Sequence, residues 1–248
     1  EDGGASDSSQ RCAVAVSHLV TTSRRLKPRA SIAISFILAG AAVRLLIYVS
    51  QGQLYVDDAA LALNIVSRSF AGLTQPLDYH QVSSIPFLWA EKLVTQVGGA
   101  NEHALRLIPL LAGMAVLVLL WTVGRRALGE EGAVLATCLG AFSSLLIGYT
   151  TAVKQYSTDA LVTLVLVWLV LEVLRSGGSR AAWWRLAVGG AAALWLSHPA
   201  VFVLVGAALA LPASPALRAG SAWRRRYAVT TLVWAGAFAL LYVLAYRT

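Results

Sequence analysis

Long apolar stretches recur along most of this chain, with little polar sequence between them. A helix needs about 20 apolar residues to cross roughly 30 Å of hydrocarbon, and several of these stretches approach that length. Hydrophobic residues make up 58% of the 248 residues and charged residues only 13%, whereas a soluble domain carries about 25% charged residues. The sequence therefore predicts an integral membrane protein, with an all-α fold that forms one polytopic helical bundle.

We predict about seven membrane spans. They lie at residues 31–49, 104–123, 132–147 and 160–174, in two spans that meet at Ser197-His198-Pro199, and at residues 227–246. Residues 1–30 lack the basic and then apolar order of a cleavable signal peptide, so we expect a disordered cytoplasmic tail there. Residues 51–102 are too polar to span. We expect them to form an extracytoplasmic loop with two amphipathic helices in the membrane interface, at about residues 58–70 and 84–97.

Basic residues set the predicted orientation. Most of the 20 lysines and arginines fall in the tail and on alternate loops, which the positive-inside rule places in the cytoplasm. The net charge of +8 therefore reflects topology, and no nucleic-acid partner is expected. The predicted location is the plasma (inner) membrane, with many spans, a cytoplasmic N-terminus and loop 51–102 outside.

An acidic pair lies just beyond the outer end of the first predicted span, in Tyr55-Val56-Asp57-Asp58. Either acid can stabilise the start of the following helix, where free N–H groups and the helix dipole favour negative charge. One acid suffices for that purpose. Two neighbouring carboxylates repel, which raises one pKa and suits a general base or a metal ligand. We expect at least one of Asp57 and Asp58 to be catalytic, and the identity of any metal stays open.

The polar segment from Lys154 to Asp159 is predicted on the same outer side as the acidic pair. The Lys154 ammonium either reaches the lipid headgroups or binds a lipid phosphate as a point charge. Tyr149 and Tyr156 offer further donors, which makes a phosphate site as reasonable as the simpler alternative. Asp159 closes the sequence Ser157-Thr158-Asp159, which is typical of a helix N-cap, and capping competes there with substrate binding.

Two more polar side chains are predicted near this surface. His198 lies at the turn between the fifth and sixth spans, where it is either a solvated turn residue or a contact to a phosphate or sugar. Arg44 lies in the outer half of the first span, where a charge is costly and requires a partner. Asp57, Asp58 or a lipid phosphate is the expected partner. The run Asp78-Tyr79-His80 is interpreted as an ordinary loop.

The order of these features resembles the GT-C glycosyltransferases, particularly the protein mannosyltransferase and aminoarabinose transferase-like group. The matching pieces are Tyr55-Val56-Asp57-Asp58 after the first span, Tyr149 with the segment Lys154 to Asp159, and Ser197-His198-Pro199. Each motif alone is short, and their order and common side give the resemblance its specificity. It extends over about residues 31–248, which we take as a GT-C-like transmembrane domain.

The resemblance implies transfer of a sugar from a polyprenyl-phosphate donor to a lipid, glycan or protein acceptor at the extracytoplasmic face. It makes Asp57 the general base, and Asp58 its neighbour and a contact to metal or acceptor. Lys154, with Tyr156 and His198, is expected to stabilise the phosphate that leaves. Inversion at the anomeric carbon follows by analogy. No cofactor is certain, and a divalent cation is the candidate.

Members of the group usually have more than ten spans, so we expect this chain to be the N-terminal part of a longer enzyme and to lack activity alone.

Two other functions remain open at this stage. A transporter or lipid flippase would place ionisable residues at mid-membrane, where the sequence has almost none apart from Arg44. A non-catalytic membrane scaffold would use Asp57 and Asp58 only to stabilise a helix end.

Overall fold

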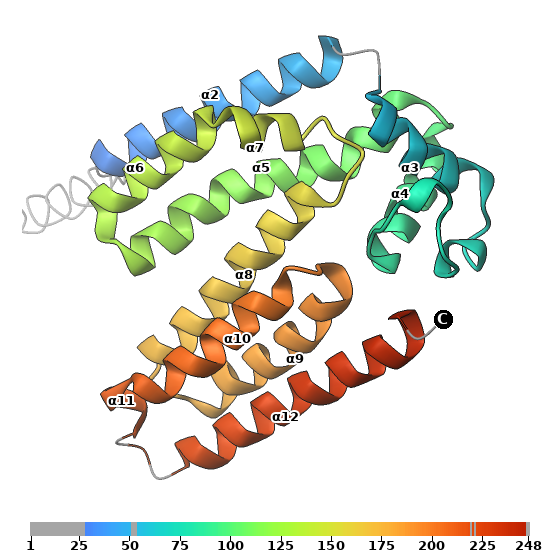
Figure 1. The fold of residues 1–248 in the computed structure, drawn as a ribbon. Coiled ribbons are helices and arrows are strands. Elements are labelled where there is room, and N and C mark those ends of the chain that lie inside the picture. The colour runs from blue at the N-terminus through green and yellow to red at the C-terminus, as the bar shows by residue number, and fades with distance from the viewer. Residues whose placement is uncertain (1–27, 51–53, 219, 221, 247–248) are drawn as a thin grey trace, which may run out of the picture.

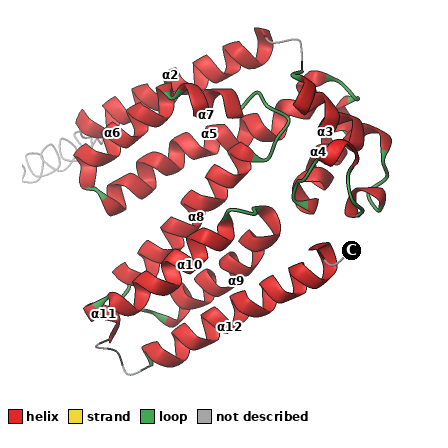
Figure 2. Ribbon diagram, in the orientation of Figure 1, coloured by secondary structure: helices red, strands yellow, loops and turns green. Residues whose placement is uncertain are grey.

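The structure is a computed structural model that describes residues 28–50, 54–218, 220 and 222–246. All regular elements in these ranges are helical, which confirms the predicted all-α fold (Figure 1; Figure 2). The predicted tail lies outside the described residues except for its last three positions. The chain forms α2 (Pro28–Ser50), α3 (Val56–Ser67), η1 (Gly72–Thr74), η2 (Asp78–His80), α4 (Ile85–Gly98), α5 (Glu102–Ala127), α6 (Gly129–Phe142), α7 (Ser144–Tyr149), α8 (Tyr156–Arg175), α9 (Arg180–Leu196), α10 (Ala200–Ala210), η3 (Leu211–Ala213), α11 (Pro215–Arg218), α12 (Trp223–Leu241) and η4 (Tyr242–Tyr246).

Four of the described helices are long and apolar enough to cross a membrane. They are Arg29–Ser50, Glu102–Ala127, Tyr156–Arg175 and Trp223–Leu244. These segments coincide with the first, second, fourth and seventh predicted spans. The other three predicted spans correspond to shorter helices, namely α6 with α7, α9, and α10. The molecule is thus a helical membrane protein, and the count of seven spans stays a prediction.

α8 joins two groups of helices (Figure 1). On one side, α5 packs against α2, α6 and α8. On the other, α9 packs against α8 and α12, and α10 packs against α8. The largest apolar core lies among α8, α9, α10 and α12. A second core lies where α3 and α4 meet the start of α5 and the loop before α8, and this core supports the candidate site described below.

The third predicted span is broken, which corrects the expectation of one continuous helix over residues 132–147. α6 ends at Phe142, Ser143 is extended with φ −62° and ψ 116°, and α7 begins at Ser144. The break leaves carbonyls at the end of α6 without helical N–H partners. Arg44 of α2 donates hydrogen bonds to two of these carbonyls. Its Nη1 donates to Ala141 O at 2.9 Å and its Nη2 donates to Gly140 O at 2.9 Å.

A buried carboxyl lies in α4. Glu91 is 0% exposed, and neither of its carboxyl oxygens has a hydrogen-bond partner among the described residues. Burial disfavours the charged form and raises the pKa of Glu91 to about 9 from the ordinary value of 4.5. Glu91 is therefore protonated at neutral pH in the folded protein.

Glu91→Gln should change how stability depends on pH. The unfolded chain releases the Glu91 proton near pH 4.5 and the folded chain near pH 9, so the wild type loses stability as the pH rises between these values. The variant has no such titration. Thermal unfolding in detergent should give similar midpoints near the acidic end and a higher midpoint for Glu91→Gln near the basic end. Parallel curves for the two proteins would contradict this assignment.

Candidate active site

Asp57 and Asp58 occupy the first turn of α3 but point into different surroundings. The N-cap of α3 is Tyr55, and no side chain caps the helix, so neither acid is the cap. Both still lie at the positive end of the helix dipole. The Asp57 side chain is 67% exposed, whereas Asp58 is only 4% exposed. The two neighbours therefore have to be considered separately.

Asp57 belongs to a closed triangle of polar contacts. Its Oδ2 lies 2.9 Å from Lys154 Nζ, and its Oδ1 accepts a hydrogen bond from Gln81 Nε2 at 2.9 Å. Lys154 Nζ in turn donates to Gln81 Oε1 at 2.6 Å. The hydrogen bonds from Lys154 and Gln81 favour the charged carboxylate and lower the pKa of Asp57. An ionised carboxylate is thus held beside an ammonium group.

Asp58 faces the interior. Burial raises its pKa, and a hydrogen bond from the backbone N–H of Val153, together with the positive charges of Lys154 and Arg106, opposes that rise. Its Oδ2 is buried and has no hydrogen-bond partner among the described residues. Asp58 therefore ties α3 to the loop before α8 and does not face solvent as Asp57 does.

Apolar packing fixes the position of Lys154. The side chain of its neighbour Val153 is 0% exposed and inserts into the core formed with Leu61 of α3 and Phe87 of α4. This insertion holds the loop before α8 against α3. Lys154 is consequently only 12% exposed in its side chain and directed to the start of α3. The Asp57–Lys154 pair therefore depends on the burial of Val153 as well as on the attraction between opposite charges.

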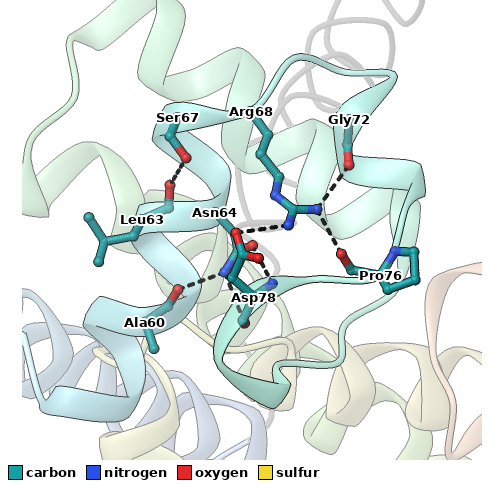
Figure 3. A network of polar contacts seen from close by, with 8 residues as sticks. All are labelled: Ala60, Leu63, Asn64, Ser67, Arg68, Gly72, Pro76 and Asp78. Atoms are coloured by element: carbon teal, nitrogen blue, oxygen red, sulfur yellow. Dashed lines mark hydrogen bonds and ion pairs between the residues drawn. The ribbon is translucent and has the colours of Figure 1, made fainter.

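The segment that carries Gln81 is folded back onto α3 (Figure 3). Asn64 Oδ1 accepts from the Asp78 N–H at 2.9 Å, and Asn64 Nδ2 donates to Asp78 O at 3.3 Å. Arg68 pairs with Asp78 Oδ2 at 2.8 Å and donates to Pro76 O at 2.8 Å. These contacts give Asp78 a structural role in a segment that the sequence indicated only as an ordinary loop.

Two residues of this segment have a strained backbone. Tyr79 and His80 adopt φ values of 60° and 54°, in the left-handed region. For residues other than glycine this conformation costs about 1–2 kcal/mol each. The two residues directly precede Gln81 and turn the chain so that its amide reaches Asp57 and Lys154. The strain is thus located at the site, where surrounding contacts hold it in place.

Gln155 connects the triangle's loop to His198. Its Oε1 accepts from the Ser84 N–H at 2.7 Å and from the Ser83 hydroxyl at 3.0 Å. Because the oxygen is occupied in this way, Gln155 Nε2 is the donor to His198 Nδ1 at 3.0 Å. Burial lowers the pKa of His198, which favours the neutral imidazole. A neutral ring that accepts at Nδ1 carries its proton on Nε2.

A pocket of about 460 Å³ adjoins these groups. It lies between the segment 73–86 and the ends of α9 and α12, and its lining includes Gln81, Ser84, His198 and Leu241. Asp57 and Lys154 do not line it, but Gln81 contacts both of them and also lines the pocket. The arrangement offers an apolar and polar cavity next to an exposed carboxylate and an ammonium.

The other predicted site residues lie around this centre. The rings of Tyr149 and Tyr156 pack with centroids 4.7 Å apart, at the two ends of the loop that carries Lys154. The N-cap of α8 is Gln155, so the prediction that Asp159 ends an N-cap sequence is wrong; Asp159 lies within the first turn. Arg44 contacts helix carbonyls, so its expected pairing with the acids is also wrong.

The sequence interpretation missed Gln81 and gave Gln155 no specific partner. Gln81 is 24 residues from Asp57 and 73 from Lys154, and no local pattern marks it. Its place depends on the hydrogen bonds of Asn64 and on the strained turn before it. The burial of Asp58 could have been predicted. Asp58 lies at helical spacing from Leu61, Ala62 and Ile65, and all four residues are buried.

Comparison with known proteins identifies the family. The family model described as dolichyl-phosphate-mannose-protein mannosyltransferase matches residues 83–246. The match includes Tyr149, Lys154, Tyr156 and His198 and begins after the acidic pair. Searches of curated proteins and of solved structures found no match. Because the family model covers most of the chain, this membrane protein belongs to the dolichyl-phosphate-mannose-protein mannosyltransferase family, a group of GT-C-type glycosyltransferases.

Proposed function

We propose that this chain transfers mannose from a polyprenyl-phosphate carrier to a protein or glycan acceptor at the extracytoplasmic face, with Asp57 as the general base. The observation that carries the proposal is the triangle of Asp57, Gln81 and Lys154 beside the 460 Å³ pocket. Membership in a transferase family argues against the transporter and scaffold alternatives. A lipid acceptor remains compatible with the same chemistry.

The two charged groups suit the two ends of a displacement reaction. In this proposal Asp57 accepts the proton of the acceptor hydroxyl while that oxygen bonds to the anomeric carbon. The bond from the anomeric carbon to the phosphate oxygen breaks, and the carrier phosphate leaves with the electron pair. Lys154 stabilises the negative charge on this phosphate. Attack and departure occur on opposite faces of the sugar, so the anomeric configuration inverts. In this proposal the 2.9 Å contact between Asp57 and Lys154 opens when the sugar binds between them.

Exposure distinguishes the two acids in this scheme. Asp57 is accessible to an acceptor hydroxyl, and its lowered pKa keeps it ionised. Asp58 is buried against Val153 and positions α3 instead. His198, with its proton on Nε2, would donate to a sugar or phosphate oxygen in the pocket that it lines. Tyr149 and Tyr156 would contribute contacts near the phosphate.

The described residues do not offer a donor set for a divalent cation. No three His, Cys, Asp or Glu side chains of the described ranges lie close enough together to hold a metal ion. Asp57 is already paired with the Lys154 ammonium at 2.9 Å. In this proposal Lys154 neutralises the charge of the phosphate.

Lys154→Met tests the phosphate role. Removing one preorganised charge that stabilises the leaving group should lower kcat/KM by about 10²–10³-fold. Transfer would be measured with the membrane-embedded chain, a polyprenyl-phosphate mannose donor and an acceptor peptide. Lys92→Met is a matched control, because Lys92 lies in α4 and donates to Val66 O at 2.9 Å, outside the triangle. Equal losses in both variants would refute the assignment.

Gln81→Leu should move the acidic limb of the pH profile. Gln81 donates to Asp57 Oδ1 and thereby lowers the pKa of Asp57. A base works in its ionised form, so activity falls as the pH drops through this pKa. Without the Gln81 donor the pKa of Asp57 rises, and the fall in kcat/KM should begin at a higher pH than in the wild type. An unchanged acidic limb would show that another group controls it.

A further inference from the structure

A second pocket lies at the far end of α8. It has a volume of about 870 Å³ and lies between the first turns of α9 and α12. α8 begins beside Lys154 and has 20 residues, so at 1.5 Å per residue its ends are about 30 Å apart. This length equals the hydrocarbon thickness of a bilayer of about 30 Å. With α8 as a membrane span, the pocket lies at the membrane surface opposite to Asp57 and Lys154.

The lining of this pocket is basic and aromatic. It includes three arginines and two tryptophans: Arg180, Arg225, Arg226, Trp183 and Trp184. No acidic side chain is among its lining residues as described. The nearby Glu172 of α8 is paired with Arg185. Arg180 and Arg225 make no hydrogen bond or ion pair with any residue that the structure describes, so their charge is uncompensated there.

A buried donor in the same pocket lacks an acceptor. Trp183 is only 3% exposed, and its indole Nε1 has no hydrogen-bond partner among the described residues. Nε1 lies beside Gly178, because a Cβ built at Gly178 would be 3.1 Å from it. The carbonyl of Gly178 already accepts a hydrogen bond from Arg226. Trp183 N–H and the Arg226 guanidinium thus both lie next to Gly178, and the N–H has no acceptor among the described residues.

The helix ends add to this preference for an anion. α9 and α12 both begin at the pocket, and their N-termini carry partial positive charge. Ser179 caps α9 by accepting from the Ala182 N–H, whereas Ala222, the N-cap of α12, makes no side-chain cap. Trp184 and Val229 of the lining are 63% and 46% exposed and provide an apolar wall. A ligand with a phosphate and an acyl chain would match both parts.

We propose that this pocket binds the phosphate group of an anionic phospholipid in the leaflet opposite to the candidate active site. Arg180 and Arg225 supply the charge, Trp183 donates its N–H to a phosphate oxygen, and Trp184 lies along an acyl chain. Basic pockets between membrane helices are suited to anionic headgroups. The simpler alternative is that these arginines only set topology, and it predicts that every arginine at this surface contributes equally to lipid binding.

Arg225→Gln and Arg224→Gln form the test pair. Both remove one positive charge from the first turn of α12, but Arg224 does not line the pocket and lies 5.9 Å from the Trp223 ring. The full chain would be placed in phosphatidylcholine nanodiscs containing some phosphatidylglycerol, and retained phosphatidylglycerol counted by native mass spectrometry. Arg225→Gln should weaken retention about fivefold, the effect of one basic residue near the surface. Equal weakening by Arg224→Gln would overturn the proposal.

Trp183→Phe tests the same site without changing charge. It keeps the ring but removes the N–H, so phosphatidylglycerol retention should fall. Trp223→Phe, at a tryptophan outside the pocket lining, should leave retention unchanged. If Trp183→Phe binds as the wild type does, the indole plays no part in recognition and the proposed site is wrong. Inorganic phosphate in pure phosphatidylcholine discs distinguishes the source of the anion. It should not raise the thermal midpoint; a rise matching that with phosphatidylglycerol would identify a site for free anions and refute the lipid assignment.

Discussion

Asp57→Asn should reduce mannosyl transfer by about 10²–10⁴-fold, the usual contribution of a positioned general base. The substitution keeps the size of the side chain, and an Asn oxygen can still accept the hydrogen bond from Gln81 Nε2 that Asp57 accepts at 2.9 Å. It removes the carboxylate that we propose as the acceptor of the proton. The loss should appear in kcat, with a small change in KM for the donor, in initial rates measured with polyprenyl-phosphate mannose.

Asp78→Asn is the matched control. Asp78 is a carboxylate in the same segment of the chain, 66% exposed in its side chain and paired with Arg68 at 2.8 Å. It therefore reproduces exposure and ion pairing outside the triangle. Asp78→Asn should transfer mannose at close to the wild-type rate, because an amide oxygen still accepts from Arg68 and Asn64 contacts only the Asp78 backbone. Asp58→Asn separates the two acids. Full activity in Asp57→Asn with loss in Asp58→Asn would move the base to Asp58.

The pairing of Asp57 with Lys154 was within reach of the sequence. The two residues are 97 positions apart, but hydropathy and the placement of basic residues predicted both on one side of the membrane. A residue predicted on one side of the membrane can contact only other residues near that surface, which limits the candidate partners of Asp57. The actual contact required more, because Val153 has to be buried between α3 and α4 before Lys154 reaches the start of α3.

The different exposure of Asp57 and Asp58 could not be predicted from their adjacency alone. Successive residues of an α-helix point about 100° apart, so one acid can face solvent while its neighbour faces the core. Which acid faces the core depends on where α3 begins and on which face packs. The helix begins at Val56, two residues before Asp58 and earlier than predicted, and its buried face includes Asp58, Leu61 and Ile65. That spacing was present in the sequence.

Arg44 illustrates a different limit of sequence reasoning. A charge within an apolar span indicates that a partner exists, and carboxylates or phosphates are the partners that sequence patterns reveal. A backbone carbonyl becomes available as a partner where a helix breaks, so this kind of partner cannot be predicted until the break is located. The break at Ser143 follows no proline, and the Ser143 side chain caps α7 by accepting from the Leu146 N–H at 3.3 Å. The partner of Arg44 could therefore be found only in the structure.

Arg44→Met should destabilise the folded chain by about 2–6 kcal/mol, because each of two carbonyls left unsatisfied costs about 1–3 kcal/mol. The Arg44 side chain is 0% exposed and donates at 2.9 Å to both Gly140 O and Ala141 O. Methionine fills similar space and supplies no donor. Thermal unfolding in detergent and retention of the folded form on titration with a denaturing detergent would measure the loss.

Arg44→Lys provides the decisive comparison for this role. It keeps the positive charge, but one ammonium on an unbranched stem replaces a planar fork that bonds two carbonyls at once. If the fork closes the break between α6 and α7, Arg44→Lys should recover only part of the stability lost in Arg44→Met. Full recovery would mean that charge alone matters. Arg68→Met is the control, because Arg68 also donates to backbone carbonyls but its side chain is 20% exposed. Water can replace these contacts, so Arg68→Met should lose less stability than Arg44→Met.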